Sequence, residues 1–129
     1  INMDDVKWLK DNYSIFLKEK SNESKIKIEE LKKDERLDEA NLEKIRLNVI
    51  EIFSKMFTIS NSDDPKILKD KYLSFFDKIT KPWYVNKEKA LKFDKQKEVI
   101  IEDIKIEEAE SLKSKFKDYY SQMDKVGVM

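Results

Sequence analysis

Carboxylates are the side chains of this sequence with the clearest potential for chemistry. They occur in two pairs and one cluster: Glu39 and Glu43, Glu98 and Glu102, and Glu107, Glu108 and Glu110. Helical bundles that bind two iron or manganese ions use inward-facing Glu together with Glu and His at positions i and i+3. The sequence contains no His, so one ligand type of such a centre is missing. We therefore expect Glu102 and Glu108 to lie on solvated helix faces beside the core, and we predict no metal site.

Nucleophiles of the usual kinds are also scarce. The chain has no Cys, which excludes thiol nucleophiles, disulfides and zinc sites built on thiolates. Ser54 precedes Lys55 and Ser114 precedes Lys115, but a Ser–Lys pair is reactive only if its lysine is desolvated. With a single Gly, the sequence also has no glycine-rich phosphate loop. We predict no catalytic residue and no cofactor.

Lysines and aromatic residues alternate near the end of the chain, in the pattern closest to one that binds nucleic acid. The residues are Lys113, Lys115, Phe116, Lys117, Tyr119 and Tyr120. Such a pattern could follow a phosphate backbone and stack on bases. However, Asp118 interrupts the positive charge, and Phe116 shares a helical stripe with Leu112. We expect these rings to pack in the core, and nucleic-acid binding is an alternative.

Large aromatic side chains gather around Pro82. The group consists of Phe75, Phe76, Trp83, Tyr84 and Phe93. Proline disturbs helical geometry, and a bend exposes the ends of the flanking helical segments. Large rings at such a bend can form a docking surface for a protein. We predict these residues as partner-binding residues. The alternative is that Trp83 and Tyr84 fill the wedge that the kink opens.

A second candidate surface is the segment 18–25, which has no apolar side chain. The apolar stripe before it resumes at Ile28 only if the helix continues through the segment. We expect one continuous helix here, with a break near residues 21–24 as the alternative. A continuous helix would let this segment project beyond the bundle or meet another chain.

Apolar residues spaced by three and four predict four long helices. The expected ranges are about 4–33, 38–59, 65–93 and 95–124, joined near 34–38, 60–65 and 93–96. We expect Asp38 and Asp64 to cap the second and third helices, with Pro65 in the first turn of the third. Short joints make successive helices antiparallel. The predicted fold is all-α, an up-down-up-down four-helix bundle formed by residues 1–129 as a single domain. Its third helix is kinked or broken at Pro82, which gives four to five helices.

One segment conflicts with the helical prediction. Residues 99–106 are rich in β-branched side chains, and Ile104 and Ile106 alternate with charge as in a strand. Residues 25–28 do the same, so a two-stranded ribbon is an alternative. We favour helix because both runs continue into residues that favour helices and lack glycine-bearing turns.

Composition limits the remaining function classes. Charged residues make up 42% of the chain, and 27 basic residues balance 27 acidic ones, so net charge gives no strong attraction to nucleic acid. No apolar run approaches the ~20 residues that span a bilayer, and we expect a cytoplasmic protein without a membrane segment. Ile1 and Asn2 precede Met3, and we expect them to lie before the native start.

These observations predict a non-catalytic interaction or scaffold module. It would bind a protein partner or a second copy of itself. A nucleic-acid accessory protein is the first alternative, and a helical-bundle enzyme with a carboxylate metal site is the second. The sequence leaves a small-molecule ligand open.

Overall fold

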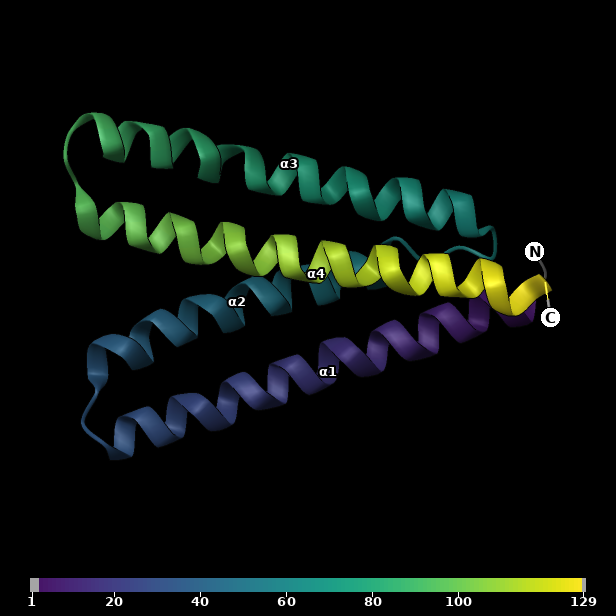
Figure 1. Ribbon diagram of the computed structural model, residues 1–129, viewed down its shortest axis with the longest axis horizontal. Helices are drawn as coiled ribbons and strands as arrows, with labels where there is room; N and C mark the ends of the chain where they lie inside the picture. The colour runs from purple at the N-terminus through teal and green to yellow at the C-terminus, as the bar shows by residue number, and fades with distance from the viewer. Residues whose placement is uncertain (1–2, 129) are drawn as a thin grey trace.

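Four helices make up the part of the chain that the structure, a computed structural model, describes. This part covers residues 3–128, with side chains described for residues 5–124; residues 1 and 2, expected to precede the native start, lie outside it. The helices are α1 (Met3–Lys33), α2 (Leu37–Ile59), α3 (Pro65–Lys92) and α4 (Gln96–Val128). Figure 1 shows two antiparallel hairpins, α1 with α2 and α3 with α4. The predicted all-α, up-down-up-down four-helix bundle is confirmed.

Two helices are continuous where the sequence left alternatives open. α1 runs through residues 18–25 and α4 runs through residues 99–106. The alternatives of a break in the first helix and of a strand at 99–106 are therefore both wrong. Ser24 explains the order of the first segment, because it is buried and its hydroxyl donates a hydrogen bond to Glu43 of α2 at 2.9 Å.

α3 continues through Pro82, so the helix count is four and not five. Pro82 lacks the N–H group that would bond the carbonyl four residues earlier. Before it, the Thr80 hydroxyl donates to the Phe76 carbonyl at 2.7 Å. After it, the Trp83 ring lies edge-on to Phe53 of α2, with centroids 6.4 Å apart. These contacts hold the helix on both sides of the missing bond.

The two predicted helix caps have different outcomes. Asp64 caps α3, with Pro65 at its start, and its Oδ1 accepts bonds from two backbone amides of the first turn at 2.9 and 3.3 Å. α2 begins one residue before Asp38, so the prediction for Asp38 is wrong. Arg36 occupies the N-cap position without a capping bond. Asp38 lies in the first turn, where its negative charge interacts favourably with the helix dipole.

Both hairpins end their first helix with the same left-handed turn. Glu35 follows α1 with φ of 60°, and Asp94 follows α3 with φ of 52°. The next amide in each joint bonds back to the carbonyl five residues earlier, at 2.9 Å after Glu35 and 2.8 Å after Asp94. This is the Schellman motif, in which Gly usually occupies the left-handed position. Both turns are therefore slightly strained, because Glu and Asp adopt positive φ less readily than Gly.

Aromatic rings from all four helices form the centre of the core. The fully buried rings include Tyr13 of α1, Phe53 of α2, Phe76 of α3 and Phe116 of α4. Phe53 and Phe76 stack with centroids 4.0 Å apart and planes 5° apart, and Tyr13 meets Phe116 edge-on. Because each large ring buries much apolar area, these contacts join the two hairpins.

Candidate functional site

The aromatic residues predicted to bind a partner lie in different environments. Phe76 is buried and stacks on a ring of α2, and Trp83 is partly buried against the same core. Phe75 is also partly buried. Tyr84 and Phe93 are exposed, and Phe93 has 66% of its surface accessible. The structure therefore does not gather the five side chains on one surface, and it places Phe76 in the core.

Three apolar side chains are exposed at or near the turn that leads from α3 into α4. We call Leu91, Phe93 and Ile100 the hairpin tip; each is at least half exposed. Phe93 also lines a hollow of about 460 Å³ together with Glu102. Glu102 is buried, and its Oε1 lies 2.9 Å from the ammonium of Lys105, while its Oε2 has no hydrogen-bond partner within the described residues. An unpaired buried acceptor of this kind is costly.

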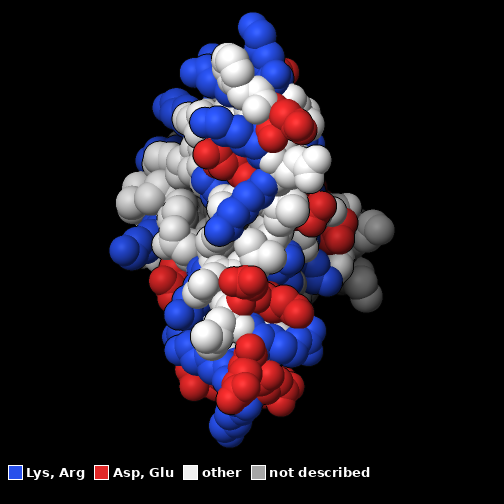
Figure 2. All heavy atoms as spheres, turned by 90° about the vertical axis from the view of Figure 1, so that its left-hand side faces the viewer, with Lys and Arg blue, Asp and Glu red and all other residues white. Residues whose placement is uncertain are grey.

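Charges of both signs surround the two hairpin turns. Figure 2 views the molecule from this end and shows Lys and Arg mixed with Asp and Glu, with uncharged side chains between them. No large patch of a single sign is visible on this face. Across residues 3–128, no helix combines the length and apolar character needed to cross a membrane.

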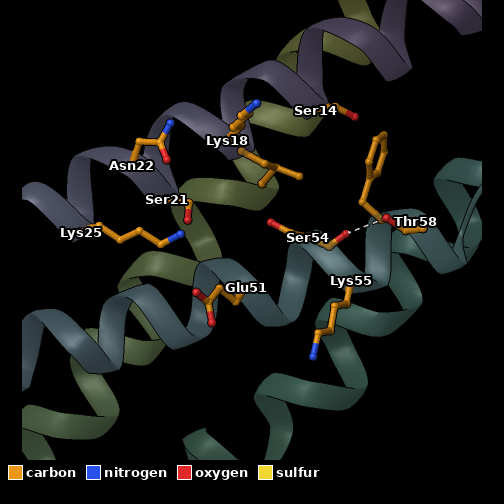
Figure 3. Close-up of a pocket in the computed structure, with 11 residues that line it drawn as sticks. Ser14, Lys18, Ser21, Asn22, Lys25, Glu51, Ser54, Lys55 and Thr58 are labelled. Atoms are coloured by element: carbon orange, nitrogen blue, oxygen red, sulfur yellow. Dashed lines mark hydrogen bonds between the residues drawn. The ribbon is translucent and has the colours of Figure 1, made fainter.

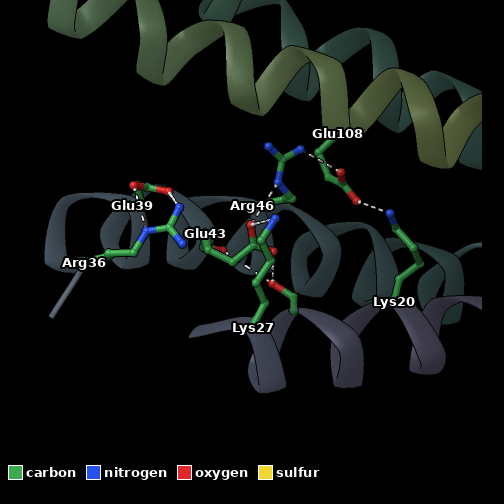
Figure 4. Close-up of polar contacts among 8 residues, drawn as sticks. Lys20, Lys27, Arg36, Glu39, Glu43, Arg46 and Glu108 are labelled. Carbon is green, nitrogen blue, oxygen red and sulfur yellow. Dashed lines mark hydrogen bonds and ion pairs between the residues drawn. The ribbon is translucent and has the colours of Figure 1, made fainter. Parts of the chain in front are cut away.

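A cluster of ionic side chains joins three helices (Figure 4). Its centre is Arg46 of α2, whose guanidinium donates to Glu43 of α2 and to Glu108 of α4, each at 3.3 Å. Lys20 of α1 lies 3.3 Å from the other oxygen of Glu108. Ser24 and Lys27 of α1 contact Glu43 at 2.9 and 3.8 Å. We call these six residues the ionic cluster.

The burial of three glutamates corrects the sequence prediction. Glu43, Glu102 and Glu108 are 7%, 8% and 3% exposed, whereas we expected Glu102 and Glu108 on solvated faces. Each is paired with a cation on a long stem, and such stems can cover apolar surface while their charged ends reach an acid. Among the described residues, no three acidic side chains are placed so that they could hold a metal ion.

A groove of about 510 Å³ separates the middle of α1 from the second half of α2. Its walls carry three lysines, four hydroxyl side chains, one amide and one carboxylate, over an apolar floor: Lys18, Lys25, Lys55, Ser14, Ser21, Ser54, Thr58, Asn22, Glu51, Leu17 and Phe57. Figure 3 shows Ser21 and Lys25 reaching from α1 toward α2, where Glu51 and Ser54 lie opposite. The groove uses part of the 18–25 segment that the sequence marked as a candidate surface.

Two buried tyrosines share a hydrogen bond inside the core. The hydroxyls of Tyr13 and Tyr72 lie 2.8 Å apart, and each also contacts a backbone carbonyl, Leu112 at 3.0 Å and Phe53 at 3.2 Å. Burial raises the pKa of Tyr13 well above its ordinary value, and burial also raises the pKa of Tyr72. Both phenols therefore stay protonated near neutral pH and serve as structural donors.

Lys113 and Lys115, near the end of the chain, contact one acid and two rings of the bundle itself. Phe116 is fully buried, which confirms the expected core packing of this ring. The ammonium of Lys115 lies over the rings of Phe16 and Tyr119, 5.7 and 5.4 Å from their centroids. Lys113 lies 3.9 Å from Asp77. Both lysines are therefore in contact with groups of the fold itself.

Comparison of the chain with protein-family models, curated proteins and solved structures finds no match.

Proposed function

We propose that this protein is a non-catalytic interaction module that binds a protein partner through the hairpin tip. The exposure of Phe93 is the observation that carries the proposal. Burying one large apolar side chain contributes roughly 1.5–3 kcal/mol, and the exposed residues Leu91 and Ile100 lie two and seven positions from Phe93 in the sequence. A few clustered apolar anchors of this kind supply most of the energy of many protein interfaces.

The polar groups near the tip support recognition of a specific partner. The hollow beside Phe93 is lined by Lys89, Lys95 and Glu98 as well as Glu102. The charges of Lys89, Lys95 and Glu98 would pair with complementary charges on a partner. Apolar contact would then provide affinity, and the mixed charges would discriminate among partners. The proposal includes a cytoplasmic location, as expected from the sequence.

A second copy of the chain is the other partner that this proposal allows. An isologous contact would place the hairpin tips of two molecules against each other. Light scattering after size exclusion separates the cases, because self-association doubles the mass and a different partner leaves the purified protein monomeric.

The proposal is tested by comparing two double variants with matched apolar losses. Leu91→Ser with Phe93→Ser removes the hairpin tip. Ile15→Ser with Ile26→Ser removes two exposed residues of α1. Because all four side chains are exposed, both variants should keep the far-UV circular dichroism and urea midpoint of the wild type. In the tip variant, self-association or the amount of partner protein retained in quantitative affinity capture should fall at least about 10-fold. The α1 variant should show no such fall. Equal retention by both variants would contradict the proposal.

A further inference from the structure

We infer that the groove between α1 and α2 is a binding site for a small phosphorylated molecule. The groove lies on the hairpin formed by α1 and α2, whereas the hairpin tip belongs to α3 and α4. This inference therefore does not depend on the proposed function. It rests on a hollow of about 510 Å³ and on the positively charged groups that line it.

The ammonium groups of the groove lack partners in the part of the chain that the structure describes. Lys18, Lys25 and Lys55 form no ion pair and no hydrogen bond among the described residues. Lys20 and Lys27, on the same helix, are engaged by the carboxylates of the ionic cluster. Lys20 and Lys27 thus contact the ionic cluster, whereas Lys18 and Lys25 of the same helix line the groove.

The groove holds more positive than negative charge although the whole chain is neutral. Three lysines stand against one carboxylate, Glu51. Lys25 and Glu51 approach from opposite walls (Figure 3) without forming an ion pair. An ammonium in this position is available to an anion that enters the groove.

Hydroxyl groups add hydrogen-bond donors to this charge. Ser14 and Ser21 line the α1 wall, and neither hydroxyl is used in a hydrogen bond among the described residues. Ser54 on the facing wall donates to the carbonyl of Ile50 at 2.8 Å, so its hydroxyl proton is already used within the helix. Phosphate oxygens accept bonds from both ammonium and hydroxyl donors, and lysine is a common phosphate ligand.

The floor explains why an organic phosphate fits better than a free one. Leu17 and Phe57 form the apolar base, and the volume exceeds what a single phosphate group fills. The phosphate would contact Lys25, which reaches toward α2 in Figure 3, while the organic part covers the floor. Glu51 opposes an anion, so the site should bind more tightly when that charge is removed.

The inference is tested by titrating the protein with phenyl phosphate, inorganic phosphate or phenol at constant ionic strength and following the amide chemical shifts. Saturable shifts confined to residues 14–25 and 51–58 are expected, with phenyl phosphate the tightest ligand. Lys25→Gln should weaken its binding about 5-fold, as expected for loss of one nearby charge of about 1 kcal/mol, and Glu51→Gln should strengthen it. Both side chains are exposed, so the variants should fold as the wild type does.

A matched control uses Lys78→Gln, which removes an exposed lysine of α3 that forms no ion pair and lies outside the groove. Phenyl phosphate should bind this variant as it binds the wild type. The inference is overturned if no saturable shifts occur, if phenol binds as tightly as phenyl phosphate, or if Lys25→Gln and Lys78→Gln have the same effect.

Discussion

Replacing Arg46 by Met should lower the free energy of unfolding by about 2–3 kcal/mol. Arg46 donates to Glu43 and Glu108, whose side chains are 8% and 3% exposed. Removing one partner from a buried ion pair costs about 3–5 kcal/mol, because a buried charge loses its compensation. The loss is smaller here because the Arg46 side chain is itself 32% exposed. Each carboxylate also keeps a second cation, Lys27 for Glu43 and Lys20 for Glu108.

The chain contains a matched control, since Arg36 is its one other arginine. Arg36 pairs with Glu39 three residues away, as Arg46 does with Glu43, but its side chain is 52% exposed. Exposed pairs of this kind contribute little to stability, so Arg36→Met should leave the free energy of unfolding almost unchanged. Urea unfolding followed by far-UV circular dichroism gives both values. Equal urea midpoints for the two variants would refute the structural role assigned to the ionic cluster.

Three further predictions concern the core and the turns. Because the pKa values of Tyr13 and Tyr72 are raised in the folded state, the unfolded state loses these protons first. The free energy of unfolding should therefore keep its full value below about pH 10 and fall above it, by up to about 2.7 kcal/mol per pH unit. Tyr13→Phe should roughly halve that slope in urea unfolding across this range, and an unchanged slope would contradict the assignment. Glu35→Gly and Asp94→Gly should each raise the free energy of unfolding by up to about 1 kcal/mol, because glycine adopts positive φ without strain; a lower thermal midpoint would argue against the left-handed turns. Pro82→Ala should raise the free energy of unfolding by roughly 1–3 kcal/mol, and with it the thermal midpoint, because alanine restores a helical hydrogen bond. A fall would show that core packing depends on the proline.

Much of the fold could be predicted because helical periodicity is a strong local signal. Asp64 and Pro65 marked the start of α3, and the short joints required antiparallel neighbours. The strand-like pattern at 99–106 did not override the helix, because the surrounding residues favour helix and bury one face. The left-handed turns at Glu35 and Asp94 could not be predicted, since neither residue type requires positive φ.

The burial of these glutamates was not predicted, because we judged the residues by their charge and not by their position on the helix. Glu43 lies fourteen residues before Phe57, and Glu102 lies fourteen residues before Phe116. A shift of two heptads returns to nearly the same face of a helix, and both phenylalanines are buried. Spacing by seven was therefore the available signal for burial. The pairing of these acids depends on which helices are neighbours, and the sequence of one helix does not contain that information.

The groove between α1 and α2 could be located only in part. Segment 18–25 was marked because it lacks apolar side chains. The facing wall, with Glu51 and Ser54, became known only from the packing of α2 against α1. The exposure of Phe93 was equally hidden, because it depends on where α3 ends relative to its neighbours. Local periodicity identifies a helix face but not what covers it.

Photo-crosslinking from position 93 tests the proposed interaction most directly. A photoreactive phenylalanine analogue replaces Phe93 in one protein and Ile15, an exposed residue of α1, in another. Irradiation in a lysate of the source organism, with the purified protein alone in parallel, is followed by mass spectrometry of the adducts. The hairpin tip should give one discrete adduct, with a particular protein or with a second copy of the chain, and position 15 should give none. The same adducts from both positions, or no adduct from position 93, would contradict the proposal.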